Sequence, residues 1–132
     1  MKIFVLDDSP LRLAAFRRHF EREHDVQTAQ TAKAAIELLS LQDFDLIFLD
    51  HDLGGKPPEY YGQDCDPSHP NTGSEVIRWM QSNPKPRNVV VHSRNSIVVV
   101  GMIEKLQTIE GTACQSIPFD KLSQAWGEFG IW

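Results

Sequence analysis

The sequence predicts an α/β protein built on a doubly wound, five-stranded parallel sheet with (βα)5 order. Five short β-branched or aromatic runs alternate with segments whose apolar residues recur at the i, i+3, i+4, i+7 spacing of a helix. Two runs, Leu46–Leu49 and Val89–Val91, are apolar without alternation, as in strands buried on both faces of a parallel sheet. The chain has 132 residues, a length that suits a single domain over residues 1–132.

The predicted strands are short, and right-handed crossovers between them would place helices on both faces of the sheet. In chain order they are Ile3–Leu6, Val26–Ala29, Leu46–Leu49, Val89–Val91 and Cys114–Ile117.

A helix is expected after each strand. The first begins at Ser9-Pro10, a pair typical of an N-cap followed by the first helical residue. The five apolar faces, in order, are Leu13, Phe16 and Phe20; Ala32, Ala35, Ile36 and Leu39; Gly73, Val76, Ile77 and Met80; Val99, Met102, Ile103 and Leu106; and Leu122, Ala125, Trp126 and Phe129.

The segment from Gly54 to Thr72 interrupts this pattern. It is too long for an ordinary βα connection and has no apolar periodicity, so we expect a long loop after the third strand that acts as a lid or a binding loop. Tyr60 and Tyr61 in this loop are candidates to cover a nucleobase. Cys65 and His69 supply only two ligands, which do not make a closed zinc site.

Charge and composition limit the function. The net charge of -5 disfavours broad binding to duplex nucleic acid, although a small phosphorylated ligand or one RNA end can bind beside a cation. Two cysteines suggest a reducing compartment, and Cys114 is expected to lie in a buried strand as a small hydrophobe. The first apolar run meets Asp7 too early for a signal peptide, and Ile97–Ile103 is too short to cross a bilayer. We therefore expect a cytoplasmic protein without membrane contact.

Acidic residues follow the first and third predicted strands. Asp7-Asp8 and Asp50-His51-Asp52 come to the edge where ligands bind in open parallel sheets. Carboxylates that converge in this way repel one another unless a cation or a shared proton intervenes, and hard oxygen ligands suit Mg²⁺ (or Mn²⁺). The alternative is that Asp7 and Asp8 only cap the first helix, and that Asp50 merely ends a strand.

The fourth strand adds His92-Ser93-Arg94 to the same edge. His51 and His92 carry imidazole groups, which suit general acid–base work, although a lone histidine beside a strand is usually structural. Arg94 could clamp a phosphate or pair with one of the site acids.

Four features of the sequence form a familiar pattern: Val5-Leu6-Asp7-Asp8, Asp45-Leu46-Ile47-Phe48-Leu49-Asp50, the hydroxyl residue Ser93, and Pro118-Phe119. With them the chain resembles, over essentially its whole length, the receiver domain of bacterial response regulators, which implies the receiver or flavodoxin-like fold. The resemblance implies that Asp7, Asp8 and Asp50 bind Mg²⁺ and that Asp52 adds its backbone carbonyl. It further implies that Asp50 is the phosphoacceptor and that Ser93 contacts the phosphoryl group.

One departure from the receiver pattern concerns the residue just before Pro118. Receivers carry a lysine there that pairs with the acyl phosphate, whereas this chain has Ile117. Lys121 is nearby but lies on the following helix, where it is a poor geometric substitute. Loss of the fixed cation removes a charge-assisted contact worth about 1.5–3 kcal/mol.

Three stretches carry a narrower resemblance: Leu49-Asp50-His51-Asp52-Leu53-Gly54-Gly55, Pro70-Asn71-Thr72-Gly73, and Val91-His92-Ser93 with Asn95. They resemble the cyclic-phosphate processing receiver-like domains. Arg94 and the apolar segment Ser96–Val100 depart from the pattern of that group.

Three hypotheses follow for the function. In the first, the protein is a Mg²⁺-dependent phosphodiesterase or phosphohydrolase that acts on cyclic or terminal phosphates of nucleotides or RNA ends; Asp50, His51 and His92 are catalytic, and Ser93 and Arg94 bind phosphate. In the second, Asp50 accepts a phosphoryl group from a histidine kinase in a phosphorelay. In the third, the domain binds a protein partner without any phosphorylation.

Overall fold

The computed structural model of the chain describes residues 1–51, 53, 72–93 and 96–122. The elements in chain order are β1 (Lys2–Leu6), α1 (Pro10–Phe20), β2 (Asp25–Ala29), α2 (Ala32–Leu41), β3 (Leu46–Leu49), α4 (Gly73–Ser82), β4 (Asn88–Val91), α5 (Ser96–Gln107), β5 (Ala113–Ser116) and a 3-10 helix (Phe119–Lys121).

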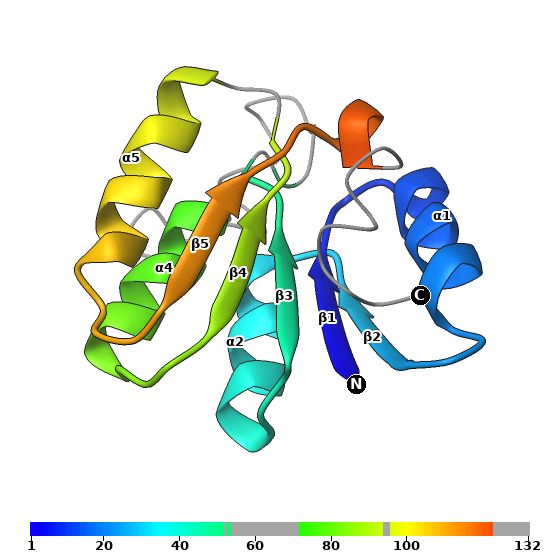
Figure 1. The fold of residues 1–132 in the computed structure, drawn as a ribbon, viewed down its shortest axis with the longest axis horizontal. Helices are drawn as coiled ribbons and strands as arrows, with labels where there is room; N and C mark the ends of the chain where they lie inside the picture. The colour runs from blue at the N-terminus through cyan, green and yellow to red at the C-terminus, as the bar shows by residue number, and fades with distance from the viewer. Residues whose placement is uncertain (52, 54–71, 94–95, 123–132) are drawn as a thin grey trace.

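The strands form one sheet in the order β2-β1-β3-β4-β5, and every neighbouring pair is parallel (Figure 1). The predicted fold class is therefore confirmed. The predicted strand limits differ from the observed ones by one residue at most. β5 begins at Ala113 and ends at Ser116, although the Ile117 amide still donates to the Val91 carbonyl at 2.9 Å.

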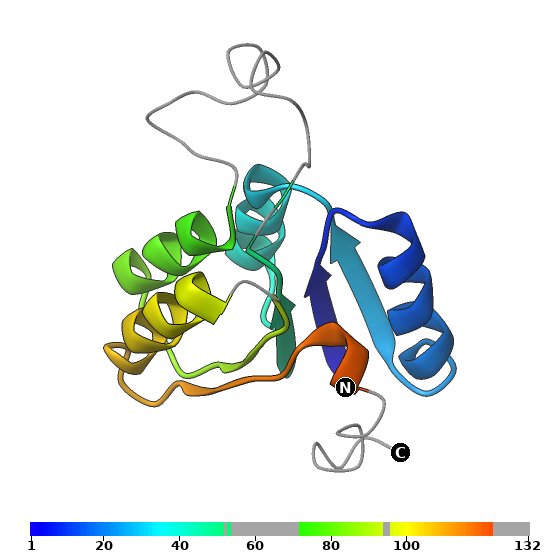
Figure 2. The same ribbon diagram turned by 90° about the horizontal axis from the view of Figure 1, so that it is seen from above.

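Two apolar clusters, one on each face, hold the sheet between its helices (Figure 2). On one face, α1 packs Leu13, Phe16 and Phe20 against strand residues that include Phe48. On the other face, α2, α4 and α5 pack against the opposite side chains of the same strands. Helices on both faces are what the unbroken apolar runs of β3 and β4 require.

The central strands of the sheet are the most deeply buried. β3 is buried along its whole length, and in β4 only the first residue is exposed. β5 at the edge is different, since three of its four residues are exposed in the described part of the chain. Cys114, which we predicted to lie in a buried strand, is only half-buried, because an edge strand has a neighbour on one side alone.

Side-chain caps define where three helices begin. The Ser9 hydroxyl accepts from the Arg12 amide, Thr31 caps α2 in the same way, and Thr72 caps α4. Pro10 occupies the first helical position of α1, as predicted.

Two of the predicted structural elements fall almost entirely outside the described residues. The first is the proposed lid or binding loop, of which only Thr72 is described. The second is the helix expected from Leu122 to Phe129, of which only Leu122 is described, as a buried residue beside α1. Within the part of the chain that the structure covers, no helix is long and apolar enough to cross a membrane.

Gly73 brings the start of α4 into direct contact with the end of β3. Its amide donates to the His51 carbonyl at 3.0 Å. A Cβ atom at this position would lie 2.1 Å from the backbone oxygen of Asp50, a distance at which one of the two segments must move. α4 can therefore begin beside Asp50 only because this residue has no side chain.

We predict that Gly73→Ala lowers the free energy of unfolding by about 1–3 kcal/mol through this overlap. Gly101→Ala is the matched control, because Gly101 lies inside α5 and a Cβ atom added there would have no neighbour within 4 Å. The control is expected to raise stability by about 0.5–1 kcal/mol through helix propensity. Urea unfolding of both variants checks the prediction, and equal effects would contradict it.

Candidate metal centre

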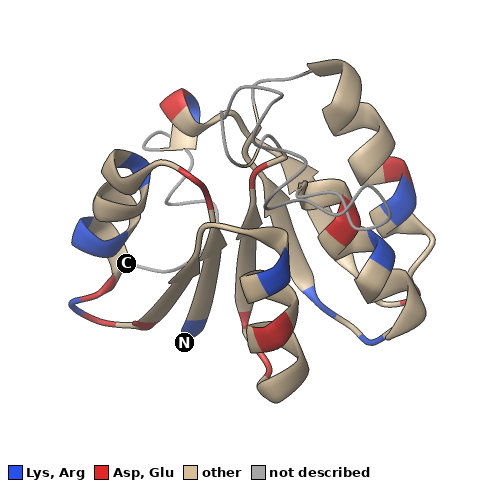
Figure 3. Ribbon diagram, turned by 180° about the vertical axis from the view of Figure 1, so that it is seen from behind, with Lys and Arg blue, Asp and Glu red and all other residues tan. Residues whose placement is uncertain are grey.

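Backbone pairing continues one residue past the ends of three strands. The Asp7 amide donates to Ala29, the Asp50 amide to Leu6, and the His92 amide to Leu49, at 2.9 to 3.1 Å. These bonds extend the parallel register in which Leu6 lies beside Leu49, and Leu49 beside Val91. Asp7, Asp50 and His92 therefore stand in one row across the carboxyl edge of the sheet, and Figure 3 shows the acidic segments after β1 and β3 side by side.

Alternation along the strands turns these three side chains to the same face. Val5, Phe48 and Val90 belong to the cluster under α1. Side chains two residues further along an extended strand point to that same side. Asp7, Asp50 and His92 accordingly point toward α1, and one ligand atom from each lies within 4.8 Å of the others.

Asp7 is the most heavily bonded side chain of the site, and it is fully buried. Its Oδ1 accepts from the Ser9 amide at 2.8 Å and from Arg12 Nη2 at 2.9 Å. Its Oδ2 accepts from Arg12 Nε at 2.8 Å and contacts His92 Nε2 at 2.9 Å. Burial alone would raise the pKa of Asp7, but the hydrogen bonds from His92, Arg12 and Ser9 outweigh it and lower the pKa to about 2.

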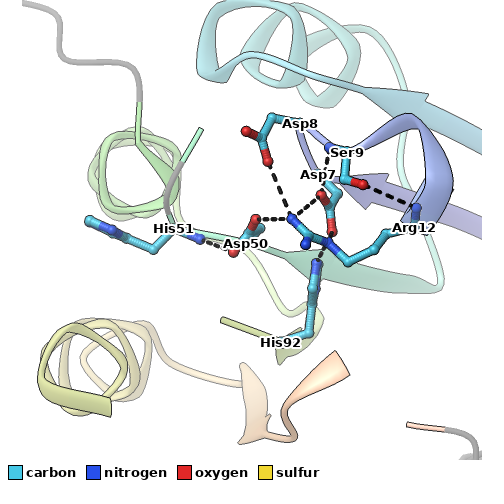
Figure 4. Close-up of polar contacts among 7 residues, drawn as sticks. All are labelled: Asp7, Asp8, Ser9, Arg12, Asp50, His51 and His92. Carbon is cyan, nitrogen blue, oxygen red and sulfur yellow. Dashed lines mark hydrogen bonds and ion pairs between the residues drawn. The ribbon is translucent and has the colours of Figure 1, made fainter. Parts of the chain in front are cut away.

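Arg12, which was not predicted from the sequence as a site residue, lies at the centre of the acidic cluster (Figure 4). Besides its two bonds to Asp7, its Nη2 approaches Asp8 Oδ1 and Asp50 Oδ2, each at 3.4 Å. The hydrogen bond with Asp7 is the main reason that the pKa of Arg12 is raised. A signal was present in the sequence: Arg12 follows Asp8 by four residues in the first turn of a helix that Ser9 caps.

Asp50 is buried like Asp7, but its pKa is shifted in the opposite direction. Its Oδ1 accepts the His51 amide at 2.9 Å, and its contact with Arg12 is a long one. Desolvation, together with the negative charge of Asp7, raises the pKa of Asp50 above its usual value. Two neighbouring acids in one site are thus shifted in opposite directions.

His92 lies beneath Asp7, with only 2% of its surface exposed, and its ring contacts Phe16 and Phe48. Because Asp7 is an acceptor, the hydrogen-bond network assigns the proton to Nε2, which donates to the carboxylate. Nδ1 is buried and has no hydrogen-bond partner among the described residues. This geometry makes His92 a residue that orients Asp7.

His51 does not join the cluster. Only its backbone amide meets Asp50, and Figure 4 shows the ring pointing away from the carboxylates toward α4. The reason is the alternation of the strand, since His51 is one residue past Asp50 and turns to the other face. The two histidines are therefore separated by the sheet edge itself.

The remaining predicted site residues divide into three groups. Asp8 reaches the cluster through Arg12, and Ser93 is buried directly after His92. Asp52 and Arg94 lie outside the described residues, so their predicted roles stay predictions. Ile117, which replaces the receiver lysine, packs with the apolar cluster under α1 and brings no charge to the site.

The described residues suit a hard divalent cation. Asp7, Asp8 and Asp50 offer carboxylate oxygens from two adjacent strand ends, which are the ligands such ions prefer. The guanidinium group already held among the three acids shows that the site attracts positive charge. Of the predicted ligands, Asp7 and Asp50 are thus in positions from which they could hold one ion, and Asp8 contacts the guanidinium group that lies beside them.

The strand order, the acids at the ends of β1 and β3, and the helices on both faces are together typical of a receiver domain. The model of the cyclic-phosphate processing receiver domain family matches residues 1–108, and the chain belongs to that family. A comparison with curated proteins gives no match.

Solved receiver domains share the fold at low sequence identity. The response regulator domain of Thermotoga maritima CheB matches with a TM-score of 0.68 and 14% identity, covering 98% of this chain and 92% of that one. The BeF3-activated receiver domain of Klebsiella pneumoniae RstA gives 0.63 and 15%, covering 99% and 98%. Thermotoga maritima TrrA, solved in complex with Mg²⁺-BeF, gives 0.62 and 19%, covering 96% of each chain.

The lowered pKa of Asp7 predicts acid sensitivity. The folded protein holds this carboxylate ionised down to about pH 2, whereas the unfolded chain protonates it near 3.8. The stabilisation is fully present above pH 3.8 and is lost as the pH falls toward 2, by on the order of 2 kcal/mol. Urea unfolding of EDTA-treated protein as a function of pH measures this loss.

The ¹³C shift of the Asp7 carboxyl group provides the direct measurement and should titrate near pH 2. Asp43→Asn is the control, because Asp43 is an exposed acid paired with Lys85 and its removal should leave the Asp7 titration unchanged. An Asp7 signal that titrates near pH 4 would contradict the prediction.

The raised pKa of Asp50 predicts the opposite effect. Ionisation of Asp50 lowers stability as the pH rises through its pKa, so a neutral isostere should stabilise the metal-free protein. We expect Asp50→Asn to raise the free energy of unfolding at pH 7 by about 0.5–2 kcal/mol, while Asp7→Asn lowers it. Urea titrations of the two variants in EDTA measure both free energies of unfolding. A change of the same sign in the two variants would contradict the prediction.

Proposed function

We propose that this protein is a divalent-metal-dependent enzyme that hydrolyses cyclic or terminal phosphates of nucleotides or RNA ends. The observation that carries the proposal is the row of carboxylates at the carboxyl edge of the sheet in a chain of the cyclic-phosphate processing receiver domain family. An acidic surface with net charge -5 fits a single small phosphorylated group better than a long polyanion.

The carboxylates of Asp7, Asp8 and Asp50 would hold the ion, Mg²⁺ or Mn²⁺. When bound, such an ion polarises a phosphoryl oxygen and lowers the pKa of the attacking water. His92 keeps Asp7 oriented through the bond from Nε2, and the Ser9 amide fixes the other oxygen of the same carboxylate. Ser93 and Arg94 stay as proposed contacts to the phosphate.

Proton transfer falls to His51 in this proposal. We expected both imidazoles to transfer protons, but the His92 ring is buried and bonded to Asp7. His51 is half-buried at the same sheet edge, directly after Asp50, so the proposal requires a substrate that spans the edge from the carboxylates to this ring.

The reaction balances without another reagent. A water oxygen bonds to the phosphorus of a 2′,3′-cyclic phosphate, and one of the two ester P–O bonds breaks. His51 accepts the proton of the water and returns it to the departing ribose oxygen, which leaves a phosphate monoester.

The second candidate is a phosphoacceptor receiver in which Asp50 takes a phosphoryl group from a histidine kinase. It is favoured by the fold shared with receivers such as that of RstA, which was solved in a BeF3-activated form. Ile117 counts against this candidate, because an isoleucine side chain cannot form an ion pair with an acyl phosphate.

Two assays separate the candidates. Incubation with Mg²⁺ or Mn²⁺ and a 2′,3′-cyclic mononucleotide should yield a monoester if the proposal holds. Treatment with acetyl phosphate should give a mass increase at Asp50 if the domain is a phosphoacceptor. A phosphorylated Asp50 without monoester formation would overturn the proposed hydrolysis.

We predict that His51→Ala lowers turnover of the cyclic nucleotide by about 10²–10⁴ while the affinity for the metal ion stays unchanged. His19→Ala is the matched control, because His19 is an exposed histidine of α1, and this variant should keep full activity. Full activity of His51→Ala would remove His51 from the reaction.

A further inference from the structure

We propose that Arg12 is an internal counter-ion which occupies the cation position of the metal-free protein, so that a divalent ion binds only as the guanidinium leaves. The inference rests on the proposed function to the extent that the three acids are taken to bind a divalent ion. It adds a competing group that sets the affinity of that ion.

The bonding capacity of Asp7 is already filled. A carboxylate offers about four lone-pair sites. In Asp7 all four are used, by the Ser9 amide, by two nitrogens of Arg12 and by His92. An ion can reach an Asp7 oxygen only if one of these donors withdraws.

Among these donors, Arg12 is the one that can withdraw. The Ser9 amide is fixed at the N-cap of α1, and the His92 ring is enclosed by Phe16 and Phe48. The Arg12 side chain is 39% exposed, against 1% for His92. The guanidinium can therefore move into solvent while the amide and the imidazole stay in place.

Charge also opposes simultaneous binding of Arg12 and an ion. The guanidinium contacts all three acids, at 2.8 Å for Asp7 and 3.4 Å for Asp8 and Asp50. A dication placed between the same oxygens would repel it at close range. Arg12 and the ion thus compete for one position, and exclusion follows from both geometry and electrostatics.

The test measures metal affinity directly, without substrate. Mn²⁺ binding is followed by the EPR signal of the free ion, and Mg²⁺ binding by calorimetry. The variants are Arg12→Gln, which removes the charge but keeps a polar side chain, and Arg12→Lys, which keeps the charge. Arg17→Gln is the matched control, since Arg17 lies on the same helix and contacts Glu21 and Thr28 instead of the site acids.

We expect Arg12→Gln to bind both ions at least about tenfold more tightly than the unchanged protein. Arg12→Lys should fall between the two, and Arg17→Gln should match the unchanged protein. A merely structural ion pair predicts the reverse, because its loss would loosen the acids and weaken binding. Unchanged or weaker binding by Arg12→Gln therefore overturns the proposal.

A second measurement stays informative if Arg12→Gln is poorly stable without metal. In ¹⁵N spectra of the unchanged protein, the Arg12 Nε–H signal should shift on addition of Mg²⁺ as its bond to Asp7 breaks, and the Arg17 signal should not. An Arg12 signal that does not shift while the ion binds would overturn the proposed competition, but not the proposed metal site. If calorimetry and EPR detect no ion in any variant, the metal requirement of the proposed function fails as well.

Discussion

The site depends on parallel backbone pairing that continues past the ends of β1, β3 and β4. Three hydrogen bonds donated by backbone amides at the sheet edge align Asp7, Asp50 and His92, and strand alternation turns their side chains to one face. This arrangement brings two negative charges into a buried row, which is unfavourable without positive charge nearby. Arg12 supplies that charge in the metal-free protein, so the fold and the polar network stabilise each other.

The strands and the acids at their ends could be predicted from the sequence, because the pattern of apolar residues indicates which segments are buried. Unbroken runs such as Leu46–Leu49 are typical of central strands, and the residue after each such run lies at the ligand-binding edge. The edge strand β5 was harder, since a strand with one neighbour shows no clear apolar run. Cys114 was accordingly placed deeper than it lies.

The partners of the acids could not be inferred from strand ends alone. Arg12 was not predicted because it lies on the polar side of the first turn of α1, outside the apolar periodicity of Leu13, Phe16 and Phe20. His51 and His92 were grouped by position, although alternation places them on opposite faces of the edge. Strand alternation separates them, because His92 lies two residues after Val90 and His51 lies three residues after Phe48.

The bonding of Asp7 has a consequence for comparing relatives of this protein. The same carboxylate receives the amide at the start of α1 and holds the ring of His92. A relative without any phosphoryl chemistry would still need an acid there to keep its first helix and the His92 ring in place. Retention of aspartate at position 7 is therefore weak evidence of retained chemistry. Asp50, whose charge is unfavourable to the fold, is the residue whose persistence would indicate selection for a role other than folding.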